Sequence, residues 1–188
     1  PIDKIDEVID SIERLINMNE KTYWVCPLIE ESEKIDLAAA EDRFHQLNLV
    51  YKDKVGLVHG KMKIEDREKV MNDFKYGKKM ILVATTVIEV GIDVPDATFM
   101  IIEHSERFGL SQLHQLRGRV GRSDKLSSCL LLYKSPLGEN AKKRIETLRG
   151  TDDGFIIAEE DLILRGAGEI LGVKQSGLPY FKIANLNI

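Results

Sequence analysis

The stretch Met80-Ile-Leu-Val-Ala-Thr85-Thr86 decides the fold, because a short and almost wholly apolar run there ends in two hydroxyl side chains. Such a run is typical of a strand that is buried on both faces of a parallel sheet. Working outward, similar strand runs occur at 23–29, 55–59, 98–102 and 128–133, and helical patterns occur at 2–16, 38–47, 64–74 and 111–116. This alternation of strands with helices predicts an α/β fold built on a parallel sheet.

Polar side chains follow the deciding strand. In parallel sheets, ligands bind at the carboxyl ends of the strands, so we expect function at Thr85, Thr86 and Glu89 and in the loops after His59 and Ile102. Threonine hydroxyls can bind phosphate oxygens there. Two threonines after a strand are also a common start of a helix, and this alternative stays open.

The pattern of alternating strands and helices ends near Pro136. Two helical patterns, 139–148 and 156–164, flank a turn at 150–154, and three glycines follow at 166, 168 and 172. The sequence therefore predicts a lobe over 1–135, followed by a small helical hairpin extension over 136–188.

Composition excludes several classes of protein. The 188 residues are 43% hydrophobic and 31% charged, which suits a globular domain, and no apolar run approaches the roughly 18 residues that span a bilayer. Cys26 and Cys129 each lie in an apolar run, so we expect buried, reduced thiols. The four histidines are scattered, and we expect no metal site.

The net charge of −4 hides an asymmetry along the chain. Residues 1–46 carry 12 acidic and 5 basic side chains, whereas residues 107–134 carry six basic side chains and one acidic residue, Asp124. Positive charge gathered in one segment indicates a site for a polyanion.

The basic segment contains Gln115-Leu-Arg-Gly118-Arg119-Val-Gly121-Arg122. Two arginines three residues apart, beside glycines that permit close approach, can both point at a transferring phosphoryl group. The alternative is that these arginines form a basic turn in contact with solvent and bind no ligand.

A false phosphate loop occurs at 56–62, where three residues instead of four separate Gly56 from Gly60 and a methionine follows the lysine. The chain by itself is therefore not expected to hydrolyse ATP.

Val83-Ala-Thr85-Thr86-Val-Ile-Glu89-Val-Gly91-Ile-Asp93-Val-Pro95 and the arginine segment lie in this order, about 30 residues apart. Together they resemble motifs V and VI of superfamily 2 helicases, with 56–60 similar to motif IVa and 24–31 similar to motif IV. The resemblance implies the RecA-like C-terminal lobe of such a motor, a parallel sheet flanked by helices, which lacks a phosphate loop.

The resemblance narrows to the RecG family of branched-DNA helicases. It is carried by Cys26-Pro-Leu-Ile-Glu-Glu31-Ser-Glu, by 103–115, by 153–162, by Arg165-Gly-Ala-Gly-Glu169 and by Gln175-Ser-Gly177, so it covers essentially the whole chain. Ala167 departs from the proline usual in RecG and matches the transcription-repair coupling factor, whose corresponding lobe is the runner-up.

This resemblance implies an ATP-dependent double-stranded DNA translocase that remodels stalled forks and Holliday junctions in recombination and repair. It assigns catalysis to Gln115, Arg119 and Arg122, nucleotide binding to Gly91, Asp93 and the same arginines, and DNA binding or coupling to Thr85, Thr86, Glu89, Arg144, Arg165 and Gln175. Asp93 would accept hydrogen bonds from ribose hydroxyls or bridge to an arginine.

The family implies partners as well. ATP with Mg²⁺ is expected mainly on an upstream motor lobe of the same polypeptide, which would also carry a wedge domain. Because the chain opens on Pro1, we expect it to be part of that longer polypeptide. The expected substrate is branched double-stranded DNA, and the expected state is a monomer in the bacterial cytoplasm, with no membrane partner.

Two classes of protein compete with this interpretation. The basic segment alone would also suit a nucleic-acid-binding module without hydrolysis, whose affinity would fall steeply with salt. A free-standing dinucleotide enzyme needs a Gly-x-Gly-x-x-Gly motif after a strand, and Gly166-Ala-Gly168 instead lies after a helical pattern.

Overall fold

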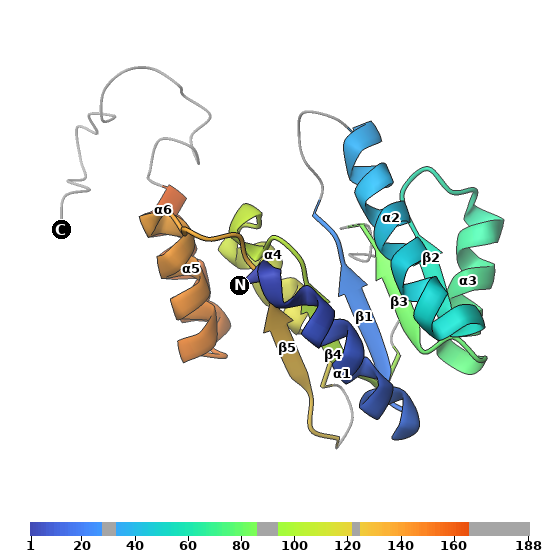
Figure 1. The fold of residues 1–188 in the computed structure, drawn as a ribbon. Coiled ribbons are helices and arrows are strands. Elements are labelled where there is room, and N and C mark those ends of the chain that lie inside the picture. Colours follow the sequence, from blue (N-terminus) through green and yellow to red (C-terminus); the bar gives the residue numbers. More distant parts are fainter. Residues whose placement is uncertain (28–32, 86–93, 122–124, 166–188) are drawn as a thin grey trace, which may run out of the picture.

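The computed structural model describes residues 1–27, 33–85, 94–121 and 125–165 (Figure 1). The elements are α1 (Ile5–Asn17), β1 (Lys21–Val25), α2 (Glu33–Tyr51), β2 (Val55–Val58), α3 (Ile64–Tyr76), β3 (Ile81–Ala84), β4 (Ala97–Ile102), α4 (Leu110–Arg117), β5 (Ser128–Leu131), α5 (Glu139–Gly150) and α6 (Gly154–Arg165). Three short 3-10 turns, Ile2–Lys4, Lys52–Lys54 and Ser105–Arg107, accompany them.

The five strands form one sheet in the order β2-β3-β1-β4-β5, and every neighbouring pair is parallel. The central strand is β1, where Tyr23 is in register with Leu82 on one side and Met100 on the other. The predicted α/β fold with a parallel sheet is therefore confirmed.

Successive residues of β1 face opposite layers of helices, as the two-residue period of a strand requires. Tyr23 and Val25 pack in a cluster with apolar side chains of α3 and α4, while Trp24 packs with those of α1 and α2. All five residues of β1 are buried. Helices on both faces thus explain why the strands read as continuous apolar runs.

Some predicted boundaries were wrong by a few residues. The strand expected over 23–29 begins at Lys21 and ends at Val25, just before Pro27, which has no N–H to continue a ladder. The helix expected over 38–47 is longer, at Glu33–Tyr51. The false phosphate loop is a strand end and a turn, as predicted. A Cβ on Gly56 would lie 2.9 Å from Val70 Cγ1, so packing explains that glycine.

The helical hairpin of α5 and α6 packs against the lobe. Leu148 of α5 and Ile157 of α6 are buried in the same cluster as Leu110 and Leu113 of α4. Ser111 Oγ of α4 also donates a hydrogen bond of 2.5 Å to Asp161 Oδ2 of α6. The division into 1–135 and 136–188 stays a prediction, and these contacts join the described part of the hairpin to α4.

Candidate functional site

The carboxyl edge of the sheet carries Thr85, as the sequence predicted. Thr85 directly follows β3 and is only 2% exposed, and among the described residues its Oγ1 has no hydrogen-bond partner. His59 follows the neighbouring strand β2, and its buried Nδ1 likewise lacks a partner within the described part of the chain. A buried polar atom without a partner is costly, so this edge offers hydrogen-bonding capacity to a ligand or to the adjoining loop. Thr86, Glu89, Gly91 and Asp93 lie outside the described residues.

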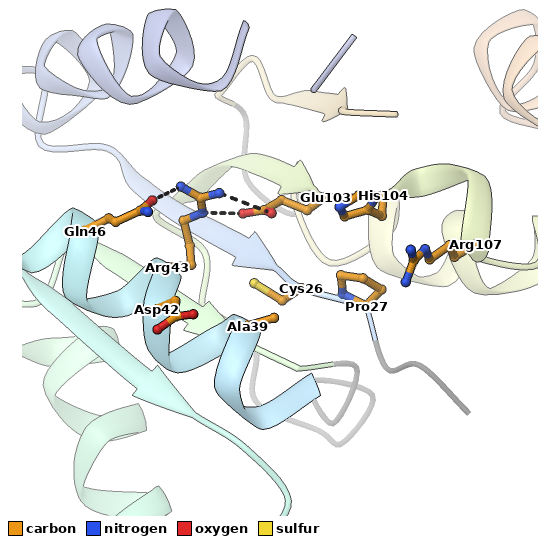
Figure 2. Close-up of a pocket in the computed structure, with 9 residues that line it drawn as sticks. All are labelled: Cys26, Pro27, Ala39, Asp42, Arg43, Gln46, Glu103, His104 and Arg107. Carbon is orange, nitrogen blue, oxygen red and sulfur yellow. Dashed lines mark hydrogen bonds and ion pairs between the residues drawn. The ribbon is translucent and has the colours of Figure 1, made fainter. Parts of the chain in front are cut away.

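A pocket of about 290 Å³ opens at the same edge, between the ends of β1 and β4 and the helix α2 (Figure 2). The buried carboxylate of Glu103 stands at its wall and accepts hydrogen bonds from Trp24 Nε1 and, at 2.5 Å, from Arg43 Nε. The Arg43 guanidinium also lies 5.3 Å from the centre of the Trp24 ring. A paired and hydrogen-bonded charge can be kept in a protein interior, whereas either partner alone would be strongly destabilising.

Two further side chains of this pocket could meet a ligand. His104 has a left-handed backbone with φ 49°, and its Nδ1 lies 3.0 Å from Glu106 Oε1. The Arg107 side chain is exposed. His104 lies in the loop after Ile102, where the sequence predicted function. Burial, reinforced by the Glu103 charge, raises the pKa of the Cys26 thiol well above its usual range, so Cys26 is neutral here. The sequence predicted function in the loop after Ile102, which includes Glu103 and Arg107, but it gave no role to Arg43 or to the pairing of Arg43 with Glu103. The one available signal was a carboxylate ending an apolar strand.

The arginine segment lies at the end of α4. Gln115 is exposed, Arg119 is partly buried, and the Arg119 N–H donates to the Leu116 carbonyl at 2.9 Å, which keeps the turn wound onto the helix. Gly121 has φ +78°, and a Cβ there would lie 2.4 Å from Ser127 Oγ. Glycine is therefore required by both backbone conformation and space. Arg122 lies outside the described residues.

Thr85 and Arg119 lie toward opposite edges of the sheet. Thr85 is at the carboxyl end of β3, whereas Gly121 contacts Ser127, just before the first residue of β5. The ion pair of 3.1 Å between Lys125 and Asp96 lies at this amino edge too, because Asp96 precedes β4. Thr85 therefore lies at the carboxyl ends of the strands, where we expected function. The arginine segment does not, because α4 runs back across the sheet toward the amino ends.

Arg144 of α5 holds the hairpin to the lobe through backbone carbonyls. Its Nη1 donates to the Phe108 carbonyl at 2.6 Å, and its Nη2 donates to the Glu106 carbonyl at 3.0 Å. Both acceptors are neutral backbone carbonyls in the segment between β4 and α4. The Arg165 side chain and Gln175 lie outside the part of the chain that the structure describes.

The described residues gather no group of three His, Cys, Asp or Glu side chains that could hold a metal ion. Within the same residues, no helix is long and apolar enough to cross a bilayer. The turn after α4 carries Arg119. Guanidinium groups bind phosphate through planar, fork-like pairs of N–H donors.

Comparison with protein families finds two matches. Residues 3–124 match the helicase conserved C-terminal domain, and residues 151–188 match the C-terminal part of domain 3 of the ATP-dependent DNA helicase RecG. The second match favours RecG over the coupling factor for the hairpin region.

Curated relatives agree with the family models. The chain is 54% identical over 172 residues to the ATP-dependent DNA helicase RecG of Pasteurella multocida, covering 91% of this chain and 25% of that protein. It is 45% identical over 186 residues to the Bacillus subtilis RecG, covering 98% of this chain and 27% of the relative. The chain thus spans about a quarter of the length of these relatives.

Solved structures support the fold. A RecG bound to a three-way DNA junction is 43% identical with a TM-score of 0.75, over 90% of this chain and 22% of that one. The C-terminal part of the Fun30 ATPase domain has a TM-score of 0.56 at 15% identity, over 90% of this chain and 54% of the other, and shows a likeness of fold alone. The expected RecA-like lobe of parallel strands flanked by helices is confirmed.

Proposed function

Because this chain belongs to the helicase conserved C-terminal domain family and matches the C-terminal helicase lobe of RecG, we propose that it is the second motor lobe of an ATP-dependent double-stranded DNA translocase. The whole enzyme would remodel branched DNA such as stalled forks and Holliday junctions, in the cytoplasm of a bacterium and as a monomer. Its RecG relative is seen on a three-way DNA junction, which supports this substrate class.

The observation that carries the proposal is the separation of the two predicted sites. Arg119 sits on a turn near the amino edge of the sheet, while Thr85 presents a buried hydroxyl at the carboxyl edge. ATP would be held between this lobe and the upstream lobe, with Arg119 and Arg122 directed at its γ-phosphate. DNA would lie along the carboxyl edge, near Thr85, Thr86 and Glu89.

The upstream lobe would supply the phosphate loop and the ligands of Mg²⁺, which neutralises charge on the transferring phosphoryl group. Closure of the two lobes on ATP would complete the site, so that hydrolysis depends on the arrangement of both. The residues of this chain would contribute the guanidinium groups and exclude water from the closed cleft.

The hairpin would pass lobe movement to the duplex. Two bonds from Arg144 to the segment between β4 and α4, together with the apolar contacts of Leu148 and Ile157, support movement of the hairpin with the lobe. The predicted coupling residues Arg165 and Gln175 follow directly, at the end of α6 and beyond it.

The test uses the full-length enzyme. We expect Arg119→Ala or Arg122→Ala to lower DNA-stimulated ATP turnover by about 10³-fold, as for removal of an arginine finger, with little change in nucleotide affinity. Arg14→Ala removes an exposed arginine from α1 and serves as the matched control. Normal turnover with weaker, salt-sensitive DNA binding would assign the arginines to nucleic acid and contradict the proposal.

A further inference from the structure

We propose that Arg117 is a positioning residue that ties the Arg119 turn to the junction between α5 and α6, so that the hairpin and the phosphate-directed arginine move as one unit. The inference rests on the proposed function, because it concerns the placement of Arg119. Arg117 is the last residue of α4 and was not among the candidate residues from the sequence.

The Arg117 guanidinium caps the C-terminal end of α5. Its Nη1 donates hydrogen bonds to the Leu148 carbonyl at 2.5 Å and to the Thr151 carbonyl at 2.9 Å. The last carbonyls of a helix lack partners within the helix and carry partial negative charge, so a cation there is favoured. Arg117 would find such acceptors at the end of its own helix, yet it reaches acceptors 31 and 34 residues further along the chain.

Two side chains orient the guanidinium further. Its Nη1 lies 3.0 Å from Asp152 Oδ1, although Asp152 is 95% exposed and this ion pair is therefore weak. Its Nη2 lies 3.0 Å from His114 Nδ1, one turn back on α4. A Cβ on Gly154 would lie 3.5 Å from His114 Nε2, so His114 stands between Arg117 and the first residue of α6.

The contacts of Arg117 would fix the position of Arg119, two residues later in the chain. The N–H of Val120 donates to the Arg117 carbonyl at 3.3 Å, and Val120 is buried in the cluster that also contains Leu148. The turn from Arg117 to Val120 is thus held at one end by a guanidinium bound to α5 and at the other by burial. A shift of the end of α5 would displace Arg119.

The surroundings of Arg117 argue against a passive role in filling space. An open pocket of about 540 Å³ lies between the ends of α4 and α5 and the start of β5, and Arg117 lines it with 20% of its side chain exposed. The hydrogen bonds of Arg117 therefore join α4 to the end of α5 at an open part of this joint, beside the apolar contacts of Leu148 and Ile157 and the two bonds of Arg144. The same pocket is lined by Arg149, which is exposed and makes no side-chain hydrogen bond to a described residue.

The test compares Arg117→Ala, Arg117→Lys and the control Arg149→Ala in the full-length enzyme. For Arg117→Ala we expect DNA-stimulated kcat to fall by roughly 10-fold or more, because a small misplacement of a reacting group has effects of this order. The KM for ATP should stay within about 2-fold, since the other lobe holds most of the nucleotide. Arg117→Lys keeps the charge but not the fork, so we expect only partial recovery, and Arg149→Ala should match the wild type.

A double-mutant cycle with Arg119→Ala separates positioning from general stability. If Arg117 acts through Arg119, then Arg117→Ala should lower kcat no further once Arg119 has been removed. The inference would be overturned if the two substitutions lowered kcat independently, so that their effects multiplied in the double mutant. It would also be overturned if kcat, DNA binding and the melting temperature all fell together. If Arg119→Ala itself leaves kcat unchanged, the proposed function fails, and that outcome is distinct from a failure of the link.

Discussion

Gly121→Ala should destabilise the lobe through two separate effects at the arginine turn. An alanine held at φ +78° costs about 1–2 kcal/mol relative to its preferred backbone. The new Cβ would also meet Ser127 Oγ at 2.4 Å and Ser127 Cβ at 3.3 Å, which forces Ser127 away from its rotamer at a cost of about 0.5–1.5 kcal/mol. We therefore expect the free energy of unfolding to fall by about 1.5–3.5 kcal/mol, the sum of these estimates.

The assay is urea unfolding of the 188-residue chain, followed by the fluorescence of Trp24, its single tryptophan, which is fully buried. In a Ser127→Ala background the Oγ contact is absent, so Gly121→Ala should cost only the backbone part, about 1–2 kcal/mol. Gly150→Ala, at the end of α5 with nothing within 4 Å of the new Cβ, is the control and should be neutral or stabilising. A loss below about 0.5 kcal/mol, or an equal loss in both backgrounds, would refute this reasoning.

Three further results are expected. The purified 188-residue chain should show no measurable ATPase because it lacks a phosphate loop, and turnover abolished by Arg119→Ala would contradict the single-lobe assignment. In the full-length enzyme, Arg165→Ala or Gln175→Ala should leave ATP hydrolysis and fork binding nearly intact while fork reversal fails; parallel loss of all three with a lowered melting temperature would indicate a structural role. Burial raises the pKa of the Cys129 thiol to about 12, so little thiolate exists at pH 8, and iodoacetamide should label native Cys129 far more slowly than the urea-unfolded chain. Equal rates in the native and unfolded chains would show that Cys129 is exposed.

The strands could be predicted because burial on both faces leaves a local record in the sequence. Every residue of β3 is buried and apolar, so this strand appears as an uninterrupted apolar run. In β1 the buried polar residues Lys21 and Thr22 precede the apolar ones, and the strand was therefore expected to begin only at residue 23. The length of α2 could not be predicted in the same way. Leu49 and Val50 near its end are 82% and 57% exposed, and exposed apolar residues blur the periodicity that marks a helix.

Sequence patterns indicated candidate site residues and could not indicate how those residues are held. Glu103 and Arg43 are 60 residues apart, and their pairing depends on the packing of α2 over the end of β4. Two of the partners of Arg117 are backbone carbonyls, which every residue possesses and which therefore leave no signal in the sequence. The placement of Arg119 away from Thr85 followed from the direction of α4, a property of the assembled sheet.

The distance between the two edges of the sheet has a consequence for how such lobes diverge. A strand rises about 3.3 Å per residue, so the six residues of β4 separate the edges by roughly 20 Å of buried, apolar core. Substitutions more than about 10 Å apart and without shared partners usually act independently. On the proposed placement of DNA along the carboxyl edge, residues there can change to suit a different nucleic acid while the turn that carries Arg119 stays as it is. Lobes of this fold can then keep one site for ATP hydrolysis and bind different polymers.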